Sequence, residues 1–218
     1  MYIEPNISYI EKAYARLKQA IVFNQLKQGE VLNERDLSAR LNISRTPLSS
    51  ALNHLMWDGW LKKSGKSKVV AEVSWNDIQE IYELRVMAEC FAAKKAARNI
   101  TPALASQMNA LLTVMGEEFE RDNDSIAYLQ RDRDWHCFIG KVANNGRLDS
   151  MLEGLHEQFV RISLITTKRG SGRILESMNE HHALAVAIAQ HDPNGAAKAC
   201  EKHVTAWFTS LSENWDKE

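Results

Sequence analysis

Residues 44–55 read SRTPLSSALNHL, and this stretch decides the fold of the first third of the chain. A hydroxyl residue that can cap a helix precedes Pro47 at the first helical position, where the missing N–H of proline costs nothing. The apolar residues after it share one helix face, which predicts a helix that buries Leu48, Leu52 and Leu55. The opposite face then presents Thr46, Ser50 and Asn53.

Upstream of this stretch, apolar residues recur every three or four positions and predict an amphipathic helix that ends near Leu26. Residues 28–30 (QGE) break that helix. A second, short helix is expected after Asn33, a residue suited to the N-cap position, with Leu37 and Leu41 buried.

Downstream, residues 60–70 (WLKKSGKSKVV) predict two short strands around a polar turn that carries four lysines. Three helices followed by a basic hairpin make a winged helix-turn-helix, whose third helix enters the DNA major groove. The alternative is a solvated hairpin on an ordinary helical domain. Charge favours a polyanionic partner, because residues 1–72 hold 11 Lys and Arg against 7 Asp and Glu, whereas residues 73–218 hold 16 against 21.

The rest of the chain predicts only helices. A capping sequence begins at Ser74, and breaks at residues 99–102, 122–124, 144–146, 169–172 and 191–195 divide the remaining chain into about six helices. We therefore predict a mainly α fold, with a winged helix-turn-helix domain over residues 1–72 and an all-α antiparallel helical bundle over residues 73–218.

Composition narrows the class of protein. The chain has 218 residues and is 44% hydrophobic, but no run of about 18 apolar residues predicts a membrane span. Charged residues near the start argue against a secretory signal, so a cytoplasmic location is expected. Three cysteines without CxxC spacing suit a reducing compartment, and we interpret them as small buried residues rather than redox centres.

One histidine pattern indicates a metal site. Asp132 and His136 stand four residues apart, so on a helix they face the same point, although such a pair also occurs as a plain surface contact. His181 and His203 are found in later amphipathic stretches. Together these four residues suit a borderline divalent ion such as zinc, nickel or manganese. The other histidines are interpreted as surface or cap residues, namely His54, His156, His182 and His191.

Arg85 and Glu89 form a second pair at helical spacing. Either they make a solvated salt bridge, or Arg85 turns inward and presents its planar fork to a ligand carboxylate. Arg161 is a second candidate for that role.

In both its N-terminal and C-terminal parts, the sequence resembles a known family, the GntR-type transcription regulators of the FadR branch. These regulators carry a helical C-terminal domain called FCD. In the N-terminal part the resemblance rests on residues 29–32 (GEVL), 34–38 (ERDLS), 44–48 (SRTPL), 51–52 (AL) with Leu55, and 58–61 (DGWL). It implies DNA contacts by Arg35 and Arg45 and a wing tip at Gly65. Ser49 stands where the family usually has a DNA-contacting arginine, so the operator sequence or the affinity should differ.

The C-terminal resemblance covers the metal residues. The family motif of Asp, three residues and His is met by Asp132 and His136, a Glu-His motif by Glu180 and His181, and the last histidine by His203. Asp192 matches the Asp that comes after the Glu-His motif. The resemblance further implies that Arg85 faces a pocket and that the effectors are small organic acids.

We therefore expect a homodimeric, ligand-responsive regulator that binds double-stranded operator DNA. The resemblance implies a repressor, because repression is the commoner outcome in the family. Its DNA-binding residues are expected to be Arg35, Arg45, Thr46, Ser49, Ser50, Asn53, Gly65 and Lys66. Two alternatives remain open. One is a metal hydrolase that uses Asp132 and the three histidines around an activated water, and the other is a C-terminal domain that serves only for dimerisation.

Overall fold

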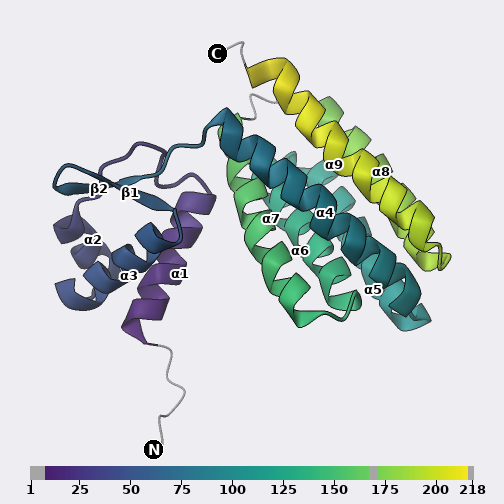
Figure 1. Ribbon diagram of the computed structural model, residues 1–218, viewed down its shortest axis with the longest axis horizontal. Coiled ribbons are helices and arrows are strands. Elements are labelled where there is room, and N and C mark those ends of the chain that lie inside the picture. The colour runs from purple at the N-terminus through teal and green to yellow at the C-terminus, as the bar shows by residue number, and fades with distance from the viewer. Residues whose placement is uncertain (1–7, 167–170, 216–218) are drawn as a thin grey trace, which may run out of the picture. The chain divides into compact units, whose positions relative to one another are not determined.

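A computed structural model describes residues 8–166 and 171–215, and the chain divides into two compact units, Met1–Val73 and Ser74–Glu218 (Figure 1). Among the described residues, the first unit contains three helices and a two-stranded antiparallel sheet, and the named elements of the second unit are all helices. The predicted mainly α fold, with a small hairpin in the N-terminal unit, is confirmed. Within the described ranges, no helix is both long and apolar enough to cross a membrane.

The first unit begins with α1 (Tyr9–Val22), which Ser8 and Glu11 cap reciprocally. The sequence predicted its end near Leu26, but the helix stops four residues earlier, at Val22. Leu26 is buried all the same, because the chain turns after the helix and returns this side chain to the core. The apolar pattern therefore continued beyond the helix that it predicted.

The helix α2 (Glu34–Leu41) starts where predicted, since the Asn33 side chain accepts hydrogen bonds from the backbone N–H groups of residues 35 and 36. Leu37 is buried, but Leu41 is only half-buried, contrary to expectation. The reason is local: Asn42 takes a left-handed conformation with φ 51°, and the chain leaves the helix directly after Leu41.

The helix α3 (Arg45–Trp57) corrects the predicted start. Its N-cap is Ser44, so Pro47 occupies the third helical position rather than the first. Proline is tolerated there because the first four N–H groups of a helix have no partner within the helix. Leu48, Leu52 and Leu55 are fully buried, as predicted, and they join α3 to the rest of the unit.

The predicted hairpin is formed by β1 (Leu61–Ser64) and β2 (Ser67–Val70), paired from Leu61 opposite Val70 to Ser64 opposite Ser67. Gly65 lies in the turn at φ 58°, a conformation that glycine adopts without steric cost. Val31 pairs with Val69 and ties the segment before α2 to the hairpin.

The second unit consists, in its described part, of helices whose ends agree with the predicted breaks. Ser74, Thr101 and Asp124 cap three of them with side-chain oxygens. Of the break predicted at residues 169–172, residues 169 and 170 lie outside the described residues, and residues 171 and 172 already belong to the next helix, contrary to the prediction. The helices are α4 (Trp75–Asn99), α5 (Pro102–Asp122), α6 (Ser125–Val142), α7 (Gly146–Thr166), α8 (Ser171–Ala189) and α9 (Pro193–Trp215).

In the bundle α4 packs lengthwise against α9, and α8 runs beside α9 (Figure 1). Buried alanines of α4 permit this close packing, and the core around them includes Met108, Leu112, Met115, Trp135, Ile139, Leu184, Ile188 and Val204. A group of buried polar and charged side chains lies among these apolar residues and forms the candidate site of this unit.

Replacing Leu52 by alanine tests the role of α3 as the core of the first unit. Leu52 is fully buried, so Leu52→Ala should lower the free energy of unfolding of this unit by about 2 to 5 kcal/mol. Calorimetry of the full chain should show its lowest thermal transition shifted down. Asn53→Ala, at the exposed neighbouring position, should change the free energy by no more than about 0.5 kcal/mol. Equal effects of the two changes would contradict the assigned face.

Candidate functional site

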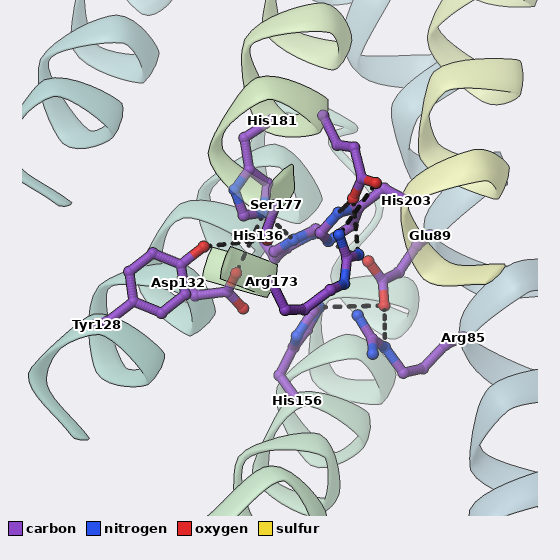
Figure 2. A network of polar contacts seen from close by, with 11 residues as sticks. Arg85, Glu89, Tyr128, Asp132, His136, His156, Arg173, Ser177, His181 and His203 are labelled. Carbon is purple, nitrogen blue, oxygen red and sulfur yellow. Dashed lines mark hydrogen bonds and ion pairs between the residues drawn. The ribbon is translucent and has the colours of Figure 1, made fainter. Parts of the chain in front are cut away.

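Four residues that the sequence singled out for metal binding meet in the middle of the bundle (Figure 2). Asp132 and His136 come from α6, His181 from α8 and His203 from α9, and all four side chains are buried. One ligand atom of each lies within 4.8 Å of those of the other three. His181 Nε2 is 3.1 Å from Asp132 Oδ1 and 3.1 Å from His136 Nε2. The alternative that Asp132 and His136 make only a surface contact is therefore wrong.

Two glutamates orient the imidazole rings. Nδ1 of His136 lies 2.9 Å from Glu89 Oε2, and Nδ1 of His203 lies 2.9 Å from Glu180 Oε2. Each contact occupies one ring nitrogen and leaves Nε2 as the nitrogen available to the group of four. Metal-binding histidines in proteins are commonly held in this way by a carboxylate. The sequence marks Glu89 as a partner of Arg85 and Glu180 as part of the Glu-His motif. Neither spacing predicts a contact with His136 or His203.

Burial and hydrogen bonding shift the pKa values of Asp132, His181 and His203. Burial raises the pKa of Asp132, but the hydrogen bond from His181 and the neighbouring imidazoles outweigh it and leave the pKa below its ordinary value. Burial lowers the pKa of His181 to about 3 and also lowers that of His203. A carboxylate and neutral imidazoles are the forms that coordinate a divalent ion.

Arg85 and Glu89 make a buried pair rather than a solvated one. Arg85 Nε lies 2.6 Å from Glu89 Oε1, and their side chains are 0% and 4% exposed. The guanidinium carbon is 4.1 Å from the ring centre of Phe159 and 4.9 Å from that of Trp207. These rings cover the guanidinium, while Nη1 and Nη2 have no hydrogen-bond partner among the described residues. Arg85 thus retains a fork of two buried donors.

The predicted surface or cap position of His156 is wrong. This residue is fully buried on α7, its ring is stacked on that of His136 at 4.8 Å, and its Nε2 is 3.6 Å from Glu89 Oε1. Burial lowers its pKa to about 3. The missed signal was its spacing, since buried Leu152 lies four residues before it and buried Phe159 three residues after it. His54, His182 and His191 are exposed, as predicted.

Glu89, His136 and His156 could in principle hold a second ion, since their ligand atoms also lie within 4.8 Å of one another. The Arg85 cation opposes this, because it already pairs with the same carboxylate. Burial raises the pKa of Glu89, but the Arg85 charge and the neighbouring imidazoles of His156 and His136 bring it well below its ordinary value. We therefore interpret Glu89 as a carboxylate shared between Arg85 and the imidazoles.

Arg161 is the second arginine that the sequence suggested for carboxylate binding. It is buried on α7, and burial lowers its pKa, while the charge that opposes this shift is that of Asp77 in the first turn of α4. Of the two arginines suggested by the sequence, Arg85 is the one that contacts Glu89.

The residues expected to bind DNA all lie on α2, α3 and the hairpin of the first unit. Arg35 is exposed in the first turn of α2, and Arg45 and Thr46 are exposed in the first turn of α3. Ser49 and Ser50 are half-buried, and Asn53 is exposed. Gly65 and Lys66 form the exposed turn of the hairpin. Of the hairpin lysines, Lys62 pairs with Glu72 and Lys68 with Glu34.

Comparisons with known proteins agree over nearly the whole chain. Residues 9–69 match the model for bacterial regulatory proteins of the gntR family, and residues 80–206 match the model for the FCD domain. The gluconate operon transcriptional repressor of Bacillus licheniformis is 23% identical over 96% of this chain and 92% of its own length. The Nta operon transcriptional regulator of Aminobacter aminovorans is 29% identical over 86% of this chain and 87% of its own length.

Among solved structures, that of E. coli McbR/YncC superposes with a TM-score of 0.82. It covers 96% of this chain and 100% of that one, at 22% identity. At this level of identity the likeness shows a common fold.

Replacing Glu180 tests the orientation of His203. Glu180→Gln keeps the shape of the side chain but weakens the charge-assisted contact with Nδ1, so the affinity for Zn(II) should fall by roughly 10- to 100-fold. The measurement is competition with a chromogenic chelator. Glu176→Gln, on the exposed side of the same helix, is the matched control and should leave the affinity unchanged. A similar loss in both variants would show that Glu180 has no orienting role.

Proposed function

Since this chain belongs to the gntR family of bacterial regulatory proteins and carries an FCD domain, it is a DNA-binding transcriptional regulator, and we propose that it is a metal-dependent sensor of a small organic acid. Membership of this family sets aside the hydrolase alternative. The observation that carries the proposal is the convergence of Asp132, His136, His181 and His203 within 4.8 Å in a chain that also bears a winged helix-turn-helix. By analogy with the gluconate operon repressor, we propose that it represses transcription in the cytoplasm.

The proposed DNA interface is the exposed side of α3 together with the hairpin turn. Arg45, Thr46 and Asn53 are available to base edges and phosphates, with Ser49 and Ser50 beside them, and Arg35 extends the same set from α2. Lys66 at the hairpin tip would contact backbone phosphate, and Gly65 allows the tight turn that presents it. With Ser49 in place of arginine, base readout would depend more on Arg45.

The proposed metal is zinc, nickel or manganese, because one carboxylate and three imidazole nitrogens are donors that suit borderline divalent ions. The residues fit such an ion: the three imidazoles and Asp132 converge, and their surroundings keep Asp132 ionised. When bound, the metal would supply a positive centre with open positions for ligand oxygens. Glu89 and Glu180 would hold His136 and His203 in the coordinating orientation.

The proposed effector is a small carboxylate that reaches both the metal and Arg85. Nη1 and Nη2 of Arg85 are buried and free to donate, and a buried donor without a partner costs free energy that a ligand can recover. His156 adds two further buried ring nitrogens that have no hydrogen-bond partner in the described part of the chain. Arg161 remains the second candidate for carboxylate binding. Arg85 is the better one, because Arg161 already interacts with the charge of Asp77.

We further propose that two chains act together as a homodimer on a palindromic operator, with half-sites about one helical turn apart or less. The effector would shift DNA binding only through its different affinities for two arrangements of the dimer. The remaining alternative is that the C-terminal domain only dimerises and that its metal only adds stability.

Arg45→Ala tests the DNA interface. Loss of one bidentate base contact should weaken operator binding by about 1 to 3 kcal/mol, roughly 5- to 150-fold. The measurement is fluorescence anisotropy with DNA from the promoter of the gene itself. Arg98→Ala, an exposed arginine on α4, removes the same charge from the other unit and should leave the affinity unchanged. Unchanged affinity in Arg45→Ala would mean that α3 does not read DNA.

Two adjacent histidines test the sensor. His181 is buried among the proposed ligands, whereas His182 is exposed, so His181→Ala should lose metal and His182→Ala should retain it. Zn(II) with gluconate or citrate should raise the melting temperature of the wild type and of His182→Ala beyond the effect of Zn(II) alone. His181→Ala should lose both increments. Stabilisation by metal without any added effect of an acid panel would favour the structural alternative.

A further inference from the structure

One face of α4 is apolar and exposed, although the opposite face of the same helix is buried in the bundle. Leu84, Met87 and Phe91 are 39%, 60% and 51% exposed. Their spacing of three and four residues places them in one stripe along the helix. Single exposed apolar residues are ordinary on a protein surface, but a contiguous row of large ones is typical of a contact surface.

A methionine of α7 widens this apolar surface. Leu148 and Leu155 of α7 belong to one buried cluster with Ala88 and Ala92 of α4, so they mark the side of α7 that packs against α4. Met151 stands three residues after the first leucine and four before the second, which places it on the same side, and it is 37% exposed. Its exposed part therefore lies at the edge of the contact between the two helices.

The charges beside the stripe have opposite signs at its two ends. Glu80 and Glu83 are exposed before it, and Lys94 and Lys95 are half-buried after it. Glu83 and Lys94 are separated by about 17 Å of helix, because each residue adds 1.5 Å, so the acidic and basic side chains cannot pair within one α4. A lysine can lay its aliphatic stem along an apolar surface and hold its ammonium group at the edge.

We propose that this face of α4 is the contact between two copies of the chain, with the two α4 helices antiparallel about a twofold axis close to residues 87–88. An antiparallel copy brings the start of one stripe to the end of the other. Glu80 then faces Lys95 of the second copy, and Glu83 faces Lys94. A twofold interface repeats each of these contacts, so the pair of helices gains four ion pairs at its rim.

The same register aligns the apolar residues. Leu84 lies as far before the axis as Phe91 lies after it, so these side chains face each other across the contact. Met87 lies beside the axis and meets the Met87 of the second copy. The exposed apolar stripe is thereby covered along its whole length.

The charge pattern favours a second copy over other occupants. A surface whose two halves carry opposite charges is complementary to its own inverted copy, whereas a uniformly acidic or basic partner is repelled by one half. A helix that lies on an anionic membrane carries Lys and Arg on its polar face, but Glu80 and Glu83 stand beside this stripe. The proposed contact rests on the homodimer proposed above and names the surface that forms it.

Cysteine cross-linking of the full-length chain tests the register. Met87→Cys puts a thiol beside the proposed axis, so a short bismaleimide should join two chains covalently on a denaturing gel. Val114→Cys, at an exposed apolar position on α5, is the matched control and should give no covalent dimer. The wild type is treated in parallel, because its Cys90 is half-buried. Equal cross-linking in both variants, or none in Met87→Cys when the wild type is a dimer in solution, would overturn the proposed contact.

Charge reversal tests the pairing. One variant carries Glu80→Lys with Glu83→Lys and the other carries Lys94→Glu with Lys95→Glu, so each places like charges opposite each other in its own dimer. Sedimentation equilibrium should show that self-association of each variant is weakened by about 10-fold or more. An equal mixture of the two should form a dimer with the mass of two 24.8 kDa chains, because opposite charges again face each other.

Glu117→Lys with Glu120→Lys, at the same spacing on the exposed side of α5, is the control for charge reversal and should associate as the wild type does. Recovery in the mixture also shows that both reversed variants are folded. Reversed variants that associate like the wild type, or a mixture that does not recover, would refute the α4 contact and leave the homodimer standing. A wild type that sediments as a monomer at every concentration would overturn the homodimer as well.

Discussion

Burial of ionisable groups at the centre of the second unit is the constraint on which its arrangement depends. Asp132, Glu89 and the histidines beside them are removed from water, and a buried charge is tolerated only when a partner compensates it. Arg85 and Glu89 pair within α4, and Arg173 and Glu180 pair within α8. Asp132 and the histidines, however, find their partners on other helices. The register of these helices against one another therefore has to bring the polar residues together at one point.

One arrangement of arginine, glutamate and histidine occurs twice in the buried polar network. Arg85 contacts Glu89, which contacts His136, and Arg173 contacts Glu180, which contacts His203. In each case a guanidinium fixes a carboxylate and the carboxylate fixes an imidazole. The two series differ at their arginines, because Arg173 binds Glu180 through both Nη atoms, whereas Arg85 binds Glu89 through Nε. Only Arg85 retains both Nη donors, which is why it is the proposed contact for an acid.

The first unit differs from the second, because its proposed functional residues are separate from its core. Its core is made mainly of leucines and valines, with Ile21 and Trp60, and its proposed functional side chains are exposed or half-buried on that scaffold. Such residues can change without loss of the fold, and Ser49 is one that departs from the pattern of the family. In the second unit the proposed functional residues are also part of the core, so function and packing cannot be changed separately.

The sequence by itself determined the order of elements, the hairpin, most helix ends and the four residues of the proposed metal site. Those features depend on spacing within one helix or turn, or on a motif that a family shares. It misplaced the end of α1 and the start of α3, because buried residues such as Leu26 continue the apolar pattern outside a helix and because proline is tolerated throughout a first turn. Only the tertiary structure decided that His156 is central and that the Arg85–Glu89 pair is buried. These facts depend on which faces of distant helices pack together, and periodicity along the chain does not encode that choice.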